Sequence, residues 1–226
     1  MSTTRNLAYA LGRVVDRSGI LALCQRIFTG IYTLYKAKDL GSFGRGSSIQ
    51  PFSIFQGQAN IHVGSGTHIW AGCLIQAERS YHWAKTTPAQ TDSGDPLLRI
   101  GDGTLVGRFC HITARERIEI GERVLMGERI LIADHDHGFK DTSRAPRDQP
   151  LAAARPVTIG DACWIGDGAA ILAGASLGTH VVVGANAVVR GEVPPFTVVA
   201  GNPARPVRRY DADLEKWLDL KPGSPV

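Results

Sequence analysis

The chain has 226 residues, of which 43% are hydrophobic and 20% charged, with 25 Lys and Arg against 21 Asp and Glu. This is the composition of a folded globular protein, so intrinsic disorder and a collagen-like fold are excluded. Glycine is abundant, with 26 residues, whereas aromatic residues make up only 7%. Many glycines and few large side chains favour a turn-rich β architecture. No apolar stretch reaches the ~18 residues of a membrane-spanning helix, and we expect no signal peptide.

The first 39 residues are basic, because they hold six Lys and Arg against two Asp and so carry the whole net charge of +4. Apolar residues recur at helical spacing on both sides of Ser18-Gly19, which predicts two short amphipathic helices with a break between them. We expect their apolar stripe to pack on the main domain, with the charges facing water. The alternative is that residues 1–39 make peripheral contact with an anionic membrane or a lipid-linked substrate.

From residue 63 onward the sequence repeats in hexads. Each begins with an aliphatic residue, usually continues with Gly, and carries a small residue or Cys at its fifth position. Three hexads form one turn, and successive turns begin at residues 63, 100, 120, 159 and 177. A period of six fits neither a helix nor a two-faced strand, and it predicts a triangular parallel β-coil with the aliphatic residues inside. Two excursions interrupt the coil, near residues 77–98 and 133–156.

These repeats resemble the hexapeptide-repeat family, whose members form a left-handed parallel β-helix, and the handedness follows from the resemblance alone. The resemblance covers about residues 40–202 and implies an all-β fold with N-terminal helices over 1–39, two protruding loops and a tail over 203–226. Residues 210–220 predict a short helix capped by Asp211 or Asp213. Cys73, Cys110 and Cys163 stand at fifth positions, so we expect reduced core residues in a cytoplasmic protein.

The excursion after Ile132 contains Asp134-His135-Asp136-His137, two imidazoles and two carboxylates in four residues. One interpretation is acid–base chemistry, in which an imidazole removes a proton and a carboxylate orients the ring. The other is a metal site, for which His111, His135 and His137 could serve.

This loop is followed by Trp164-Ile165-Gly166 and by Gly201-Asn202-Pro203-Ala204. In this order the motifs are similar to those of the maltose and galactoside acetyltransferases and of the O-acetyltransferases of nodulation factors and surface polysaccharides. The resemblance implies that His135 is the general base toward the acceptor, with His137 as the second choice. Asp134 or Asp136 would orient His135 or hold the acceptor, and His137 also fits a structural role within its loop.

The resemblance further implies acetyl-CoA as the acyl donor, bound between neighbouring subunits of a homotrimer, with no metal. The positions that match the family's coenzyme contacts are Asp167, Ala185, Arg190 and Arg208, and Trp164 stands nearby. Arg205 and Arg209 would add positive charge for the phosphates. A backbone N–H near Gly166 and Asp167 would stabilise the oxyanion. The chain departs from its relatives at two places, since these often carry Ser or Ala where Asp167 stands and Thr-Lys where Arg190-Gly191 stands. The alternative for each arginine is a solvated C-terminal surface.

Together these features predict an acetyl-CoA-dependent O-acetyltransferase that acts by direct transfer on a sugar hydroxyl, with a surface polysaccharide or exopolysaccharide precursor as acceptor. The excursion near 77–98 contains Tyr81 and Trp83, which could stack on sugar rings or pack against a neighbouring subunit. The alternatives are an amino-sugar N-acetyltransferase, a metal-dependent β-helix enzyme of the carbonic anhydrase type, and a non-catalytic scaffold. The repeats are net neutral, so we expect no nucleic acid partner.

Overall fold

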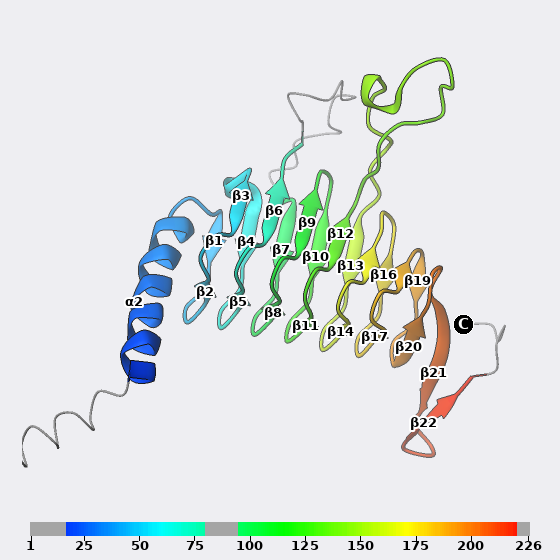
Figure 1. The fold of residues 1–226 in the computed structure, drawn as a ribbon. Coiled ribbons are helices and arrows are strands. Elements are labelled where there is room, and N and C mark those ends of the chain that lie inside the picture. The colour runs from blue at the N-terminus through cyan, green and yellow to red at the C-terminus, as the bar shows by residue number, and fades with distance from the viewer. Residues whose placement is uncertain (1–16, 80–94, 221–226) are drawn as a thin grey trace, which may run out of the picture.

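The structure is a computed structural model that describes residues 17–79 and 95–220. In this part of the chain, helix α2 (Arg17–Ala37) is followed by short strands that stack into three sheets around a triangular coil (Figure 1). Every strand pair within the coil is parallel, as between β10 and β13 or β9 and β12. The prediction of an all-β parallel coil is therefore confirmed. Within the described residues, no helix is long and apolar enough to cross a bilayer.

The three sheets form the three faces of the prism. The first, sheet A, contains β1 (Ser42–Phe43), β4 (Ile61–Val63), β7 (Leu98–Ile100), β10 (Ile118–Ile120), β13 (Val157–Ile159), β16 (Ser176–Leu177) and β19 (Glu192–Val193). Sheet B contains β2 (Ser48–Ile49), β5 (His68–Ile69), β8 (Leu105–Val106), β11 (Leu125–Met126), β14 (Trp164–Ile165), β17 (Val182–Val183), β20 (Thr197–Ala200), β21 (Arg205–Asp211) and β22 (Lys216–Asp219). Sheet C contains β3 (Ile54–Gln56), β6 (Leu74–Ala77), β9 (His111–Ala114), β12 (Leu131–Ala133), β15 (Ala170–Ile171) and β18 (Val188–Val189). Two single turns of 3-10 helix, Gln58–Asn60 and Pro146–Asp148, lie outside the sheets.

The first residue of each hexad builds the core. In sheet A these residues stand in register from coil to coil and are all buried: Val63, Ile100, Ile120, Ile159 and Leu177. Burying a side chain of this size stabilises the fold by about 1.5–3 kcal/mol relative to leaving it exposed. The hexad spacing thus places one aliphatic side chain on the inner face of each sheet in each turn.

The fifth position of the hexad bonds one coil to the next. The Thr104 hydroxyl donates to the carbonyl of Gly121, at 2.8 Å. In the same way the thiols of Cys73, Cys110 and Cys163 donate to the carbonyls of Gly107, Gly127 and Gly178, at 3.1–3.3 Å. All three thiols are free and buried, which confirms the prediction that they are core residues.

Helix α2 differs from the predicted N-terminal segment in two ways. It runs without interruption through Ser18 and Gly19, so the predicted break is wrong. A glycine weakens a helix by about 1 kcal/mol relative to alanine but need not end it. The apolar stripe does not pack on the coil either, since Leu23, Ile27 and Ile31 are all more than half exposed.

The C-terminal segment is a β-hairpin, so the predicted short helix over residues 210–220 is wrong. Strand β21 pairs antiparallel with β20, the last strand of sheet B in the coil, and β22 pairs with β21. An unpaired edge strand offers backbone hydrogen bonds that a helix could not satisfy. Asp211 does cap a turn, because its carboxylate accepts the backbone N–H groups of Asp213 and Leu214 at 3.0 and 2.9 Å.

Both predicted excursions leave the coil at the same corner, between sheets C and A. The loop over residues 133–156 projects from the stack there (Figure 1). The loop over residues 133–156 is described throughout. Most of the loop near 77–98 is not, and the proposed sugar-stacking residues Tyr81 and Trp83 lie outside the described residues.

Candidate active site

The most buried polar group of the long loop is the side chain of Asp134, directly after β12. Its carboxylate accepts the backbone N–H groups of Arg115, Glu116 and Arg117 at 2.7–3.0 Å, which form the corner of the preceding coil. Successive backbone N–H groups of this kind form a concave binding site for an anion. The corner thus fixes the Asp134 side chain, which has no exposed surface.

Asp134 also binds the neighbouring histidine. The Nδ1 atom of His135 lies 2.8 Å from Oδ1 of Asp134, and the His135 side chain is only 10% exposed. A carboxylate can only accept hydrogen bonds, so Nδ1 is the donor and Nε2 of the neutral ring carries the lone pair. Of the two aspartates left open by the sequence, Asp134 is therefore the one that contacts His135. Asp136 is exposed, and its carbonyl accepts the N–H of Ala152 at 3.0 Å.

Two side chains that the sequence analysis did not assign to the acetyl transfer, His111 and Gln76, lie on the outer face of sheet C. Nε2 of His111 lies 3.2 Å from Oε1 of Gln76, on adjacent strands β9 and β6. Burial lowers the pKa of His111, and the nearby charge of His135 lowers it further. His111 and His135 are thus close enough to interact. The signal in the sequence was that both polar residues stand at outward positions of hexads, on two neighbouring strands of sheet C.

A single buried amide holds the loop together. The Gln149 side chain donates to the carbonyls of Asp141 and Arg144 at 2.8 and 2.9 Å and accepts the Asp141 N–H at 3.1 Å. His137 pairs with Leu151 through an isolated β-bridge, and the His137 side chain is exposed. These contacts make the outer part of the loop a compact unit, whereas His135 is held at the corner of the coil by Asp134.

The metal interpretation required His111, His135 and His137 to converge. Over residues 17–79 and 95–220, no group of three His, Cys, Asp or Glu side chains lies close enough to hold a metal ion.

The residues proposed for the coenzyme lie on other parts of the prism. Gly166, Asp167 and Ala185 occupy the corner between sheets B and C on two successive coils, whereas His135 follows sheet C at its other edge. Trp164, 53% exposed, stands on the outer face of sheet B. Within one chain, the proposed base and the proposed coenzyme residues are therefore on different edges of the triangle.

Two of the proposed coenzyme groups have structural partners. The N–H of Gly166 donates to the carbonyl of Val183 at 2.8 Å, so this N–H is not available to an oxyanion. The Asp167 carboxylate accepts the N–H of Glu128 in the preceding coil, also at 2.8 Å. This bond belongs to the coil corner and does not need a ligand.

The proposed phosphate-binding arginines divide into two sets. Arg190 and Arg205 line one small hollow of about 230 Å³ near the C-terminal end of the coil. Arg208 lies on the outer face of sheet B, opposite Val198, and its guanidinium binds the Asp219 carboxylate at 2.6 Å. Arg209 stands beside it on β21 and is exposed.

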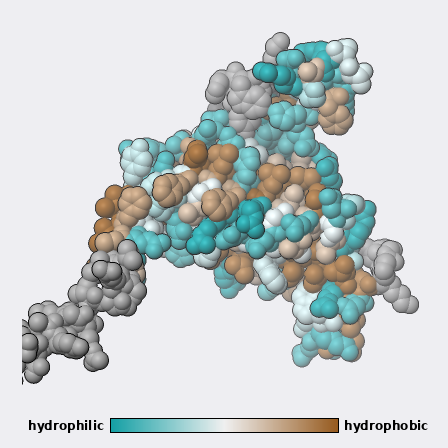
Figure 2. All heavy atoms as spheres, in the orientation of Figure 1, coloured by the Kyte–Doolittle hydropathy of each residue, from teal (hydrophilic) through white to brown (hydrophobic). Residues whose placement is uncertain are grey.

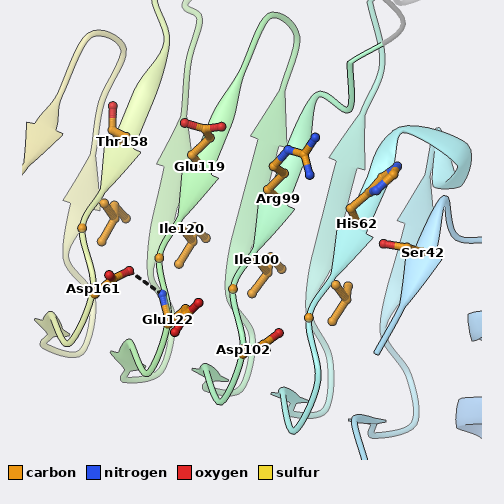
Figure 3. A pocket seen from close by; sticks show the side chains of 16 residues that line it. Ser42, His62, Arg99, Ile100, Asp102, Glu119, Ile120, Glu122, Thr158 and Asp161 are labelled. Atoms are coloured by element: carbon orange, nitrogen blue, oxygen red, sulfur yellow. Dashed lines mark hydrogen bonds between the residues drawn. The ribbon is translucent and has the colours of Figure 1, made fainter. Parts of the chain in front are cut away.

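A shallow groove of about 510 Å³ runs along the outer face of sheet A (Figure 3). It is lined by outward side chains that stand in register, among them His62, Arg99 and Glu119. Asp161 at its edge accepts the N–H of Glu122 at 2.8 Å, which again ties two coils together. None of the residues proposed for the reaction lines this groove.

The fold and the loop define a class of protein: a hexad-built parallel β-helix that presents a carboxylate-bound histidine on a protruding loop. The sequence profile of the family described as "Bacterial transferase hexapeptide (six repeats)" matches residues 156–191. Over this segment the chain carries the repeat of the hexapeptide-repeat transferases, and its fold is the left-handed parallel β-helix expected from that family.

Among curated proteins, the chain is similar to WbbJ of Escherichia coli strain K12, named as a candidate lipopolysaccharide biosynthesis O-acetyl transferase. The two are 35% identical over 130 residues, 55% of this chain and 66% of WbbJ. A candidate acetyltransferase of Mycobacterium tuberculosis, Rv3034c, is 39% identical over 158 residues, 69% of this chain and 52% of the relative. The chain thus spans between about half and two thirds of the length of these relatives.

Among solved structures, a hexapeptide-repeat acetyltransferase of Vibrio cholerae, VCA0836, is 26% identical, with a TM-score of 0.52 over 77% of this chain and 76% of its own. It has also been solved with acetyl coenzyme A. The N-acyltransferase AntD of Bacillus cereus, solved as a mutant with dTDP and coenzyme A, has a TM-score of 0.63 over 80% of this chain and 89% of its own. At 14% identity AntD shows the shared fold only.

Proposed function

We propose that the protein is an acetyl-CoA-dependent O-acetyltransferase whose acceptor is a sugar hydroxyl of a surface polysaccharide or exopolysaccharide precursor. The observation that carries the proposal is the buried Asp134–His135 pair, displayed on a loop of a hexapeptide-repeat β-helix. The similarity to WbbJ supports oxygen as the acceptor atom and a surface glycan as the acceptor class.

In this mechanism His135 is the general base. Asp134 binds Nδ1, so Nε2 takes the proton of the acceptor hydroxyl as its oxygen attacks the thioester carbonyl. The new carbon–oxygen bond forms, the carbon–sulfur bond breaks, and the proton held on Nε2 passes to the leaving thiolate. The products are the acetyl ester and free coenzyme A, and no acetyl-enzyme is formed.

For acetyl-CoA we propose a site along the outer face of sheet B and the corner that follows it. Trp164 offers an exposed ring, and the neighbouring Gly166 and Ala185 carry no large side chain that would obstruct an extended pantetheine chain. Arg190 and Arg205 share one hollow, where two guanidinium groups would bind the nucleotide phosphates. Arg208 already has a carboxylate partner, so we assign it a smaller share of this binding.

The separation of these groups within one chain supports a homotrimer. His135 and the Gly166 corner lie on opposite edges of sheet C, so a second subunit beside the first would bring one subunit's histidine to the other's coenzyme face. Leu125 and Trp164 are neighbours on sheet B and both about half exposed, which gives that face an apolar surface for such a contact. The four free thiols support a cytoplasmic location, where the thioester donor is available.

The test is release of free thiol from acetyl-CoA in the presence of purified sugars, glycan precursors and amino sugars, with the product identified by mass spectrometry. We expect release that depends on a hydroxyl acceptor and a product with an alkali-labile acetyl ester. The matched control is His135→Ala, which should release thiol only at the background rate. An alkali-stable amide product would replace this proposal by amino-sugar N-acetylation.

A further inference from the structure

Helix α2 carries an apolar stripe that faces away from the protein. Six side chains make up the stripe, and they are 53–75% exposed: Leu23, Ile27, Phe28, Ile31, Leu34 and Tyr35. Their spacing of three and four residues places them on one side of the helix. Figure 2 shows the corresponding hydrophobic surface over α2 at the end of the stack.

The opposite side of α2 attaches the helix to the coil, and it does so through polar groups. The Thr33 hydroxyl accepts the N–H of Ile49 at 2.9 Å and donates to its carbonyl at 3.1 Å. The Tyr32 hydroxyl donates to the carbonyl of Ser53 at 2.7 Å. A helix at the surface of a globular protein normally buries its apolar stripe and exposes its polar side. In α2 this arrangement is reversed, so none of the described residues covers the stripe and it is open to a partner.

The charges around the stripe indicate what this partner is. The ammonium groups of Lys36 and Lys38 lie 5.5 and 5.2 Å from the ring of Tyr35, at the end of the stripe. Residues 1–39 hold the whole net charge of the chain. A second copy of this surface would bring the same cations together, whereas an anionic lipid surface offers the opposite charge and an apolar layer beneath it.

We propose that α2 binds an anionic membrane surface, with its apolar stripe in the boundary between headgroups and acyl chains and its lysines among the headgroups. The coil, attached to the polar side of the helix, would then stand on the water side of the membrane. This inference does not depend on the transferase reaction, because lipid binding requires neither acetyl-CoA nor an acceptor.

The experiment is flotation of the full chain with two kinds of vesicle, pure phosphatidylcholine and phosphatidylcholine with about one-third phosphatidylglycerol. We expect the protein to float with the anionic vesicles and to remain behind with the neutral ones. Raising the salt concentration should release it, because the electrostatic part of the attraction is screened. Failure to float with anionic vesicles at low salt would overturn the proposal.

One double variant and two single variants separate the apolar and the charged contributions. Ile27→Gln with Ile31→Gln should reduce binding at least tenfold, since two apolar side chains leave the stripe. Lys36→Gln and Lys38→Gln should each reduce binding to the anionic vesicles about fivefold. The matched control is Leu214→Gln, which removes an apolar side chain that is 55% exposed in the C-terminal hairpin. Binding that is unchanged in the Ile27/Ile31 variant would contradict the proposal.

Cys24 offers a direct probe, because it is exposed on α2 while the other three cysteines are buried. A polarity-sensitive fluorophore on this thiol should report water in the free protein and an apolar environment with anionic vesicles. Two results would contradict membrane binding. An apolar fluorophore signal without lipid would mean that the stripe is already covered within the chain or by a second copy. An assembly that dissociates in the ultracentrifuge when Ile27 and Ile31 are changed would assign the stripe to a contact between copies. An unchanged circular dichroism spectrum and unfolding midpoint of each variant would show that the coil is still folded.

Discussion

The Asp134 carboxylate is held by three backbone N–H groups and by His135 at once. Its position is set by the corner of the preceding coil, at residues 115–117, and not by its own loop. The sequence shows two aspartates flanking His135 but contains no sign of this corner, so it could not decide between Asp134 and Asp136. Contacts between coils depend on the register of the stack, which only the structure gives.

The first prediction separates the two histidines of the loop. His135→Ala should lower kcat by roughly 10²–10⁴-fold, the contribution of a positioned general base, with little change in acetyl-CoA affinity. His137→Ala should have a much smaller effect, because this side chain is exposed and its backbone pairs with Leu151. Steady-state kinetics and calorimetry on both variants check this. The reverse order of effects would show that the base has been misassigned.

The second prediction concerns pH. The pKa of His111 is lowered by burial and then by His135, so the unfolded chain binds this proton more tightly than the folded chain does. The free energy of unfolding should therefore fall as the pH drops below the unfolded value of about 6.5. His62, whose pKa is lowered by burial and by Arg99, acts in the same direction.

Denaturant unfolding of the wild type and of His111→Asn checks this between about pH 7.5 and 5.5. The variant should lose less stability over this range than the wild type, and the rest of the loss should remain because His62 is still present. Equal losses in the two proteins would contradict the assignment to His111.

At the scale of elements, the coil could be predicted well because its signal is local and repeated. In each hexad the aliphatic first residue identifies the side chain that points inward, and the small fifth residue identifies the corner. An error in the assigned register would therefore have broken the repeat pattern. The two ends could not be predicted in this way. Helix α2 and the β21–β22 hairpin depend on what the first and last coils leave unpaired, and that is a property of the finished stack.

The long loop gives a third prediction. Gln149 is buried and makes three hydrogen bonds that join the two halves of the loop. Gln149→Ala leaves the polar partners of this side chain unpaired. We expect the closed conformation of the loop to be destabilised by about 1–3 kcal/mol, so that the loop opens more often. Hydrogen exchange should accelerate over residues 134–152 and remain unchanged in the coil. Lys140→Ala, at an exposed position of the same loop, is the control, and equal exchange in both variants would contradict the role of Gln149.

The buried cysteines give a fourth prediction. Burial raises the pKa of Cys163 to about 11, so its thiol stays protonated and unreactive near neutral pH. Alkylation of the folded protein should modify Cys24 alone, and denaturation should expose all four thiols. Mass spectrometry of the alkylated chain checks this. Rapid modification of Cys163 in the folded state would mean that the coil opens there.

For the whole molecule, the central feature is that no single chain brings His135 to the proposed coenzyme face. The sequence led to these residues through their resemblance to a family, but it could not show that they lie on different edges of a prism. The homotrimer that we propose would resolve this separation. Leu125→Asp, which puts a charge on the apolar face beside Trp164, should lower the mass measured by light scattering and abolish turnover. Leu214→Asp, in the C-terminal hairpin, should leave both unchanged, and a monomeric wild type would contradict the shared site.

The most direct test of the account is a calorimetric titration of the full chain with acetyl-CoA, because it does not require the acceptor to be known. We predict saturable binding with micromolar affinity and about one site per chain, retained in His135→Ala and weakened when Arg190 and Arg205 are both changed to Ala. The absence of binding up to millimolar acetyl-CoA would contradict the transferase function.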